Sequence, residues 1–479
     1  MRLPAHVLAL GSLLGTITVA ATALADTPPS TASDSDSDAA APERPKILFN
    51  RWQEDWSVLA DPSLRTEPWD FLKYIPLWSQ DPKSYASLGV TIRERIESNH
   101  APSFGVGPGN GDTYLLDRLQ FHADIRPDQH WQLFVQLEDV RAPWKDVITP
   151  VDENPLDLRQ AFVAFTVPFA GGELKARVGR QEMAFDLQRF VSVRDGPNVR
   201  QAYDAAWLDW EKGPWRTIAF WSEPVQYRHG DPFDDFSGTD FQYGGFRVER
   251  NDIGPGSLAV YYSYFRLNEA RYLFASGDER RNIVDVHYAG AKQGFDWDLE
   301  AMGQFGEVGD KTARAWGFGA LGGYTFDSVW GRPRLGLQLD GASGDRRPND
   351  DTIETFNPLF PNGYYFTLAG YTSYVNLFHL KPSLTVRVTP SVKLMAAVAG
   401  QWRETTDDAV YVQPNIPVAG TAGRPGQWSG IYGQLRADWA ITPNVSVAFE
   451  AVHFDVGDAI QRAGGHDSDY FNVQLQLAF

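Results

Sequence analysis

Apolar and polar residues alternate one by one along most of the chain from about residue 84. In one clear case, Leu119, Phe121, Ala123 and Ile125 are separated by single polar or charged residues. Strict alternation is the signature of a β-strand with one apolar and one polar face. Because the polar face carries full charges in strand after strand, the pattern indicates a barrel with apolar residues toward lipid and polar residues toward a wet lumen.

Short turns and longer polar stretches follow each other along this region. Eight turn signals rich in Gly or Pro recur, for example Gly171-Gly172, Gly254-Pro255-Gly256 and Pro443. Nine longer polar stretches flank them, near 97–113, 139–157, 182–202, 222–240, 266–281, 304–314, 341–370, 402–430 and 455–469. Nine hairpins predict an all-β, transmembrane antiparallel β-barrel of about 18 strands, with short periplasmic turns and long extracellular loops.

The two ends of the chain carry export signals. Arg2 precedes a mostly apolar run from Val7 to Ala20, which is too short to span a bilayer as a helix. Small residues follow at Ala23-Leu24-Ala25, so we expect residues 1–25 to be a signal peptide that is cleaved near Ala25/Asp26. At the other end, apolar residues occupy every odd position from Phe471 to Phe479. This predicts a closing strand whose terminal Phe479 is read by the outer-membrane assembly machinery.

Three further segments follow the signal peptide. Residues 26–46 are rich in Ser, Asp, Pro and Ala and predict a disordered acidic linker, because they offer almost no apolar surface to bury. Residues 47–83 place several Trp among charges and predict an ordered periplasmic segment. We expect this segment to plug or cap the periplasmic mouth, because its aromatic side chains need a surface to cover. Residues 84–479 form the predicted barrel.

Composition narrows the function. The formal net charge of −18 argues against nucleic acid as a partner. The absence of cysteine excludes disulfides, thiolate metal sites and cysteine nucleophiles. The 16 Trp, 19 Tyr and 29 Phe suit the aromatic girdles of a barrel that contacts lipid at both membrane interfaces. We therefore expect a multi-pass protein of the Gram-negative cell outer membrane.

Three blocks of this sequence resemble a known family. They are RWQEDWSVLADPSLRTEPWDFLKYIPL (Arg51 to Leu77), RVGRQEMAFDLQRFVSVRDGPNVRQAYD (Arg177 to Asp204) and FNPLFPNGYYF (Phe356 to Phe366). The chain is similar to the alginate export family of outer-membrane β-barrels over most of its mature length. The resemblance implies an 18-stranded barrel with a polar lumen, and it implies an outer-membrane conduit more firmly than it implies alginate.

Arginine is the candidate residue type for transport. Its planar guanidinium binds carboxylates with paired hydrogen bonds, and rings of basic residues favour anions in a pore. Strand alternation, together with the family-like block at 177–204, predicts a set of pore-lining or substrate-binding residues. These are Arg93, Arg95, Arg118, Arg126, Arg177, Arg180, Gln181, Glu182, Arg189, Arg194, Asp195, Asn198, Arg200, Arg387 and Arg436. We expect Arg180, Arg194 and Arg200 at a constriction, provided that the long loops fold inward.

A plainer interpretation stands beside this one. Alternation also turns many Asp and Glu inward, including Glu97, Asp124 and Glu450. Charges of opposite sign on neighbouring strands pair with each other. For a single arginine such pairing is the stronger expectation.

Sites for metals and catalysis are weakly supported. Asp231 to Asp235 and Asp345 to Asp351 offer carboxylates to Ca²⁺, but they lack the spacing of a calcium loop, so solvated charged loops are the stronger interpretation and we expect no cofactor. The adjacent His466, Asp467 and Ser468 have the residue types of a catalytic triad, whose members must converge in space rather than in sequence.

The leading hypothesis is a channel or secretion conduit for an anionic solute, with an acidic polysaccharide such as alginate implied by the resemblance. A first alternative is a substrate-specific porin that imports small sugars or organic acids. A second is a hydrolase on a barrel scaffold, and a third is a structural or adhesin barrel. The protein is not expected to be an enzyme.

Overall fold

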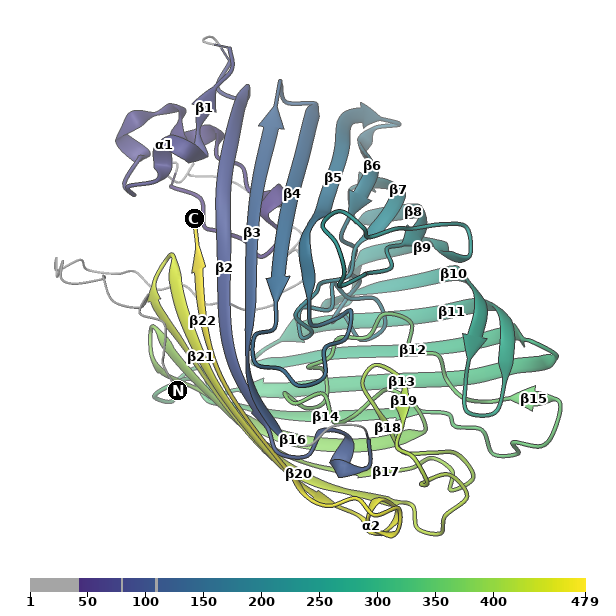
Figure 1. Cartoon of the computed structure of the whole chain (residues 1–479). Helices are drawn as coiled ribbons and strands as arrows, with labels where there is room; N and C mark the ends of the chain where they lie inside the picture. The colour runs from purple at the N-terminus through teal and green to yellow at the C-terminus, as the bar shows by residue number, and fades with distance from the viewer. Residues whose placement is uncertain (1–42, 79–80, 108–110) are drawn as a thin grey trace.

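The computed structural model describes residues 43–78, 81–107 and 111–479. The predicted signal peptide and most of the predicted linker lie outside these residues. The described chain forms a closed barrel of eighteen long antiparallel strands, as predicted (Figure 1). These strands are β2 Tyr85–Asn99, β3 Asp112–Arg126, β4 Trp131–Arg141, β5 Asn154–Phe169, β6 Gly172–Gln181, β7 Tyr203–Lys212, β8 Trp215–Pro224, β9 Phe241–Ile253, β10 Gly256–Arg271, β11 Ser276–Lys292, β12 Phe295–Val308, β13 Lys311–Thr325, β14 Arg334–Ala342, β16 Leu377–Thr389, β17 Val392–Trp402, β20 Trp428–Thr442, β21 Val445–Val456 and β22 Ser468–Ala478.

The first and last of these strands close the barrel. Each long strand pairs with its neighbours in sequence, and β22 pairs with β2 from Asn99↔Tyr470 to Thr91↔Ala478. The predicted closing strand therefore pairs with the first long strand and closes the barrel. Because every strand edge is paired, the barrel leaves no free edge on which another chain could add.

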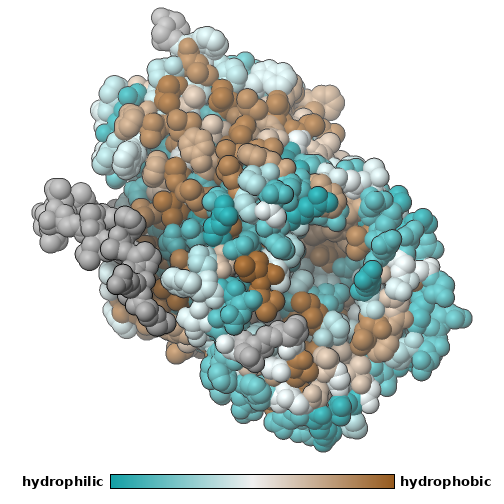
Figure 2. Space-filling view, in the orientation of Figure 1, coloured by the Kyte–Doolittle hydropathy of each residue, from teal (hydrophilic) through white to brown (hydrophobic). Residues whose placement is uncertain are grey.

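Burial is inverted relative to a soluble protein. On β3, Leu119 and Phe121 are 43% and 44% exposed, whereas Arg118 and Gln120 are each 3% exposed. Figure 2 shows apolar residues gathered in the upper part of the view, where Figure 1 places β2 to β5, and mainly polar residues at the lower, loop-bearing end. The apolar face is the outer wall, and the charged face is the lining of the lumen.

The eight predicted turns lie at one end of the barrel and the longer connections at the other. Two connections are much shorter than expected. Residues 272–275 join β10 to β11, and residues 309–310 join β12 to β13, so the expected long loops near 266–281 and 304–314 are wrong. The charges in these stretches sit on strands whose pairing continues to Val308↔Lys311.

Short elements decorate both ends. On the extracellular side these are β15 Thr352–Ile353, the β18 Tyr411–Val412 and β19 Ile416–Pro417 pair, a 3-10 turn at Pro102–Gly105 and α2 Asp458–Arg462. On the side of the short turns, residues 43–78 form three 3-10 turns (Arg51–Gln53, Ser57–Ala60 and Pro62–Leu64), α1 Asp70–Lys73 and β1 Ile75–Pro76. In the described parts of the chain, no helix is both long and apolar enough to cross a membrane.

The N-terminal segment, residues 43–78, lies against the end of β2 (Figure 1). Its β1 pairs with β2 at Ile75↔Ala86 and Pro76↔Tyr85. Trp56, Leu59 and Tyr74 pack with Tyr85 in a small buried cluster. The aromatic residues that the sequence places in this segment are therefore partly used to fix it to the first strand.

Candidate functional site

A long loop, residues 182–202 between β6 and β7, folds into the lumen. One part of it is held by Arg189, whose Nη1 lies 2.5 Å from Asp298 and 2.9 Å from Glu300 on β12. Another part is held by Arg93 on β2 and Arg118 on β3. The loop therefore spans the lumen between two walls that are far apart in strand order.

Three guanidinium groups converge on one carboxylate of this loop. Asp195 lies 2.5 Å from Arg118, 3.7 Å from Arg93 and 3.8 Å from Arg200. We call Arg93, Arg118 and Arg200 the arginine trio. Burial by itself would raise the pKa of Asp195, but Arg118, Arg93 and Arg200 hold that pKa well below its usual range. The trio side chains are at most 5% exposed, whereas the Asp195 side chain is 39% exposed.

The arginines also hold the backbone of the loop. Arg93 donates to the Asp195 carbonyl at 2.9 Å, and Arg118 donates to the Asn198 and Pro197 carbonyls at 2.7 and 2.8 Å. Arg95 donates to the Gly196 carbonyl at 2.9 Å. Hydrogen bonds from a charged donor are stronger than neutral ones. The short stretch 195–198 is therefore fixed against the β2–β3 wall by main-chain contacts that do not depend on the Asp195 side chain.

A second loop, residues 343–376 between β14 and β16, packs against the first. Val191 and Phe360 form an isolated parallel bridge, and Phe190, Phe356 and Tyr374 join the same buried cluster. Tyr365 accepts from Arg189 and donates to Asp340, each at 2.6 Å. Tyr364 hydrogen-bonds with Arg95. The two loops together make a partition whose edge at the β2–β3 wall carries the arginine trio.

Elsewhere the lumen pairs its charges between neighbours, as the plainer interpretation expects. Arg126 lies 3.0 Å from Asp124, Arg216 lies 2.6 Å from Asp209, and Arg436 lies 2.5 Å from Glu450. Such pairs leave little net field for a passing ion. The arginine trio differs because three positive groups share Asp195, and among the described residues the one other acid in an ion pair with them is Glu182, 2.6 Å from Arg200.

The N-terminal segment contacts inward residues of the barrel and of the first loop. Arg177 stacks over the Trp52 ring at 4.3 Å, and Arg126 donates to the Trp52 and Glu54 carbonyls at 3.1 and 2.7 Å. Arg200 of the arginine trio lies 4.2 Å over the Phe49 ring. The segment thus reaches from the rim of the barrel to the partition.

Lys73 anchors the same segment to β2. Its Nζ donates to the Leu88 carbonyl at 2.9 Å. A Cβ added at Gly89 would lie 2.5 Å from this Nζ, so only glycine leaves room for it. Burial, and then the nearby charge of Arg51, lowers the pKa of Lys73 to about 7. Arg51 itself donates to the Phe479 carbonyl at 2.8 Å and ties the segment to the end of the last strand.

Several predicted residues come together at the partition, and others do not. Arg93, Arg95, Arg118, Asp195, Asn198 and Arg200 meet there, with Glu182 beside them. Arg126 and Arg177 lie under the N-terminal segment, where the Gln181 amide accepts from Arg177. Arg189 holds the far end of the loop, and Arg387 and Arg436 belong to β16 and β20 on another wall. Among the residues that the structure describes, the Arg194 side chain has no ion-pair partner, although its main-chain N–H donates to Ser192.

Arg180 does not reach the constriction, contrary to the expectation. It pairs on β6 with Ala161, next to the inward pair Gly179↔Phe162, so alternation turns its side chain away from the lumen. There it lies 2.9 Å from Asp204, another outward residue. The expectation counted Arg180 with the loop that folds inward, but this residue still belongs to β6, where strand alternation fixes the side that it faces.

Sequence reasoning missed several residues of the site. Arg159 on β5 is fully buried, lies 3.0 Å from Glu138 and donates to the Arg200 carbonyl. Tyr364 and Tyr365 lie in the block FNPLFPNGYYF, which indicated the family but gave no function for these two side chains. Phe49 precedes the family-like block and gave no signal of its own.

Neither the acidic loop at Asp231 to Asp235 nor the residues His466, Asp467 and Ser468 form part of the arginine site. The carboxylate oxygens of Asp157, Asp234 and Asp235 lie within 4.8 Å of one another. Arg180 lies 3.8 Å from Asp157, and Arg159 lies 4.0 Å from Asp235, so arginines already accompany two of these three acids. Ser468 donates to the Ala101 carbonyl, and His466 contacts the Asp467 carbonyl. His466, Asp467 and Ser468 are thus engaged separately rather than as a triad.

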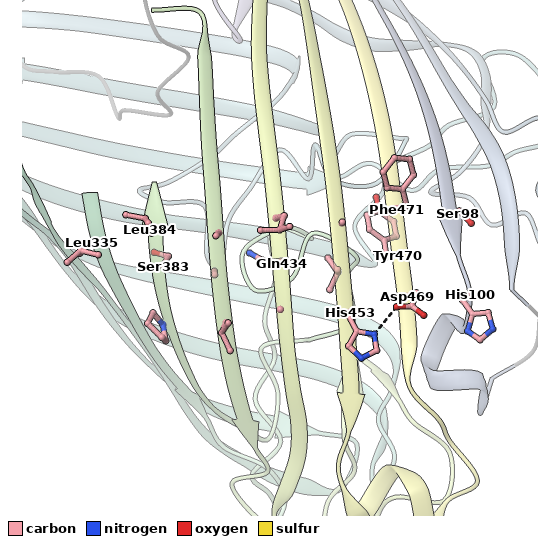
Figure 3. A pocket seen from close by; sticks show the side chains of 18 residues that line it. Ser98, His100, Leu335, Ser383, Leu384, Gln434, His453, Asp469, Tyr470 and Phe471 are labelled. Carbon is pink, nitrogen blue, oxygen red and sulfur yellow. Dashed lines mark hydrogen bonds and ion pairs between the residues drawn. The ribbon is translucent and has the colours of Figure 1, made fainter. Parts of the chain in front are cut away.

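A large groove of about 800 Å³ lies away from this site. It is lined mainly by outward residues of β14, β16, β17 and β20 to β22, including Ala396, Gly433 and Ala451 (Figure 3). At one end His453 lies 2.7 Å from Asp469. Because this groove is on the lipid-facing wall, it is not part of the conduit.

Comparisons with known proteins agree with this architecture. Over 82% of this chain the fold is similar to Pseudomonas aeruginosa OccK3 (10% identity, 95% of that chain, TM-score 0.53) and to Acinetobacter baumannii OccAB3 (9%, 99%, 0.57). It is also similar to Pseudomonas aeruginosa OccK2 in a structure with glucuronate (12% identity, 82% of this chain, 96% of that chain, TM-score 0.54). No curated protein matches the chain. The profile of the family described as Alginate export matches residues 84–474, so this outer-membrane barrel belongs to the alginate export family.

Proposed function

We propose that the lumen conducts an anionic polysaccharide, with a polyuronate such as alginate as the working cargo. The carboxylates of the chain pass the edge of the partition, where the arginine trio supplies the positive field. Membership of the alginate export family supports this cargo class. Catalysis has no part in the proposal.

The observation that carries the proposal is the convergence of three guanidinium groups on the half-exposed carboxylate of Asp195. The Asp195 carboxylate between these arginines supports a site for carboxylates, because geometry and charge are both complementary to one. A uronate that replaces or shares the place of Asp195 would find the same field. The loop would stay in position, because main-chain carbonyls anchor it.

We propose further that residues 47–83 act as a cap on the periplasmic mouth. Support comes from the described part of this segment, in which Trp52 reaches Arg177 and Phe49 reaches Arg200. A cap in contact with the trio would leave when a polymer enters from the periplasm. Deleting residues 26–83 should raise single-channel conductance, and an unchanged conductance would refute the cap.

A second candidate, a porin for small sugar acids, keeps one specific observation in its favour. The two lumen loops pack through a buried aromatic cluster, which narrows the passage with rigid material. The OccK2 structure that this fold resembles was determined with glucuronate, a monomeric uronate. The likeness to OccK2 concerns the fold alone.

A planar-bilayer recording separates these two candidates. The purified protein is exposed to oligomeric alginate or to glucuronate, and the block of ionic current is measured. If the oligomer blocks the current at a far lower concentration of uronate residues than free glucuronate does, the polysaccharide conduit is supported. Equal block per uronate residue supports the small-solute porin. Arg118→Gln should weaken either block, whereas Arg332→Gln in an exposed periplasmic turn should not.

We also propose that the terminal strand addresses the chain to the outer-membrane assembly machinery. Phe479 stacks on Trp69 of the N-terminal segment at 5.3 Å, so its ring is engaged once the barrel has folded. Phe479→Ala should lower the amount of protein inserted in the membrane while leaving the residual channels normal.

A further inference from the structure

A row of outward residues near the extracellular ends of β10 to β13 locates the membrane interface on the outer wall. Tyr262, Val284, Gly303 and Trp316 lie in one row across the four strands. Trp316 is stacked with Phe318 at 6.0 Å and lies 6.1 Å from Phe378. Outward aromatic residues of a barrel mark the membrane interface. The row of Trp316 is therefore the outer interface of the apolar band.

Arginines project outward just beyond this row. Arg314 is two residues further along β13, about 7 Å at the usual strand rise. Arg280 on β11 and Arg266 on β10 are two residues further still, in a row with Glu307 on β12. Their neighbours Phe265, Glu279, Arg281 and Ala313 are at most 3% exposed and face inward, so alternation turns the three arginines outward. They stand at the level of lipid headgroups.

The charges on this patch are unbalanced. Arg266 and Arg280 are direct cross-strand partners on one face, an arrangement that is destabilising for like charges. Glu307 lies 3.0 Å from Arg280. Within the described parts of the chain, Arg266 and Arg314 have no carboxylate partner. The positive charge that an added anion could meet on this patch is therefore carried mainly by Arg266 and Arg314.

An apolar trough opens directly below these arginines. It has a volume of about 480 Å³ and is lined by apolar residues of β11 to β13, including Val284, Gly303 and Trp316, together with Gln304, Arg314, Arg346 and Glu354. Arg346 forms an ion pair with Glu404, so Arg314 is the cation of the trough that faces an added headgroup. Its floor is open because a Cβ placed on Gly303 would meet nothing within 4 Å. A trough of this kind accepts a hydrocarbon chain, and its rim faces the headgroup of the same molecule.

We propose that this patch binds a phosphorylated glycolipid of the outer leaflet, with a phosphate between Arg266, Arg280 and Arg314 and an acyl chain in the trough. Phosphate is the anion that the planar fork of arginine binds best. The opposed pair Arg266 and Arg280 would then be bridged rather than repelled. The inference stands apart from the conduit, because all of these side chains lie on the outside of the barrel.

The groove of Figure 3 provides an internal comparison. It is larger and equally open, since a Cβ on Gly433 would meet nothing within 4 Å. Its end carries His100 and the His453–Asp469 pair instead of arginines (Figure 3). Filling Gly433 and filling Gly303 are therefore matched changes, of which only the second touches the arginine patch.

The test is binding of bisphosphorylated lipid A to the purified full-length protein in detergent, measured by native mass spectrometry. The triple variant Arg266→Gln, Arg280→Gln and Arg314→Gln should weaken binding by about tenfold or more, because the loss of a single charge-assisted hydrogen bond already costs about tenfold. Gly303→Leu should also weaken it. Gly433→Leu and Arg250→Gln, an outward arginine at the periplasmic end of β9, should leave it within about twofold of the parent.

Three results would overturn the proposal. One is equal binding of lipid A from which the phosphates have been removed. Another is parent-like binding by the triple variant and by Gly303→Leu, when heat-dependent gel mobility shows that both are folded. The third is equal binding of phosphatidylglycerol with the same sensitivity to these variants, which would assign the patch to phosphate in general rather than to the glycolipid.

Discussion

Asp195 is the best single position at which to test the field of the lumen. Asp195→Asn removes one negative charge and keeps the size of the side chain. The loop should stay in place, because Arg93, Arg95 and Arg118 hold it through the carbonyls of Asp195, Gly196, Pro197 and Asn198. The change therefore exposes the arginine trio without dismantling the partition.

The size of the effect follows from Coulomb's law. An ion that passes about 5 Å from the lost carboxylate, in a water-like medium, changes its energy by about 0.8 kcal/mol. The sign is opposite for a cation and an anion, so the difference between them is about 1.7 kcal/mol. Each 1.4 kcal/mol corresponds to a factor of ten, and the anion-to-cation permeability ratio should rise by about tenfold or somewhat more.

The assay is the reversal potential of the purified protein in a planar bilayer under a KCl gradient. Asp195→Asn should move it toward the chloride potential, and Arg118→Gln should move it the other way. Asp327→Asn is the matched control, because its 61% exposed side chain makes an ion pair with Arg332 in a periplasmic turn. An Asp195→Asn channel with the parent reversal potential would show that ions do not pass the trio, and would refute this account of the conduit.

Further predictions concern the cap and the partition. Gly89→Ala would place a Cβ 2.3 Å from His122 Cε1 and 2.5 Å from the Lys73 Nζ and the Phe479 carbonyl. Because Lys73 anchors residues 43–78, this segment should undock and be cleaved faster by trypsin, whereas the outward Gly303→Ala should change nothing. Because burial lowers the pKa of Lys73 to about 7 from an unfolded value of about 10.5, docking should strengthen as pH rises between these values, by up to about 1.4 kcal/mol per pH unit. Trypsin cleavage should therefore be faster at pH 6.5 than at pH 9, and Lys73→Met should abolish the difference. Arg189→Ala removes the buried guanidinium from Asp298 and Glu300, which among the described residues keep only His287 and the Tyr261 hydroxyl as partners. It should destabilise the barrel by about 3 kcal/mol in denaturant unfolding, against less than about 1 kcal/mol for Arg332→Ala.

The barrel was predictable because its signal is local. Alternation with a period of two needs only a few consecutive residues, and the turns at Gly171-Gly172 and Pro443 separate strands that pair with their neighbours. Arg93 and Arg118 could be turned inward on the same basis. Arg180 was placed wrongly because it was counted with the inward loop, whereas it is one of the last residues of β6 and faces outward by the same alternation.

The partition was not predictable because its contacts are distant in sequence. Arg189 and Asp298 are 109 positions apart, and Ser192 and Phe360 are 168 apart. No local pattern states that two polar loops pack against each other inside a lumen. The strand ends near 266–281 and 304–314 were misjudged for a related reason. The charges in these stretches indicate that the chain has left the membrane, but they do not indicate that it has left the sheet. β10 to β13 continue as paired strands through these charged residues.

The arginines of the lumen have two tasks, and the structure shows how these are divided. Arg118 donates to the carbonyls of Asp195, Pro197 and Asn198, and Arg93 donates to the Asp195 carbonyl and to the Asn198 side chain. Removing either arginine would therefore disturb the loop and the field together. Asp195 lies among them with a 39% exposed side chain, whose charge tunes the field alone. Selectivity can therefore vary through the acid while the arginines keep the partition standing. We therefore expect changes at the exposed carboxylate to alter which ions and polymers pass, without loss of the partition that the buried arginines hold.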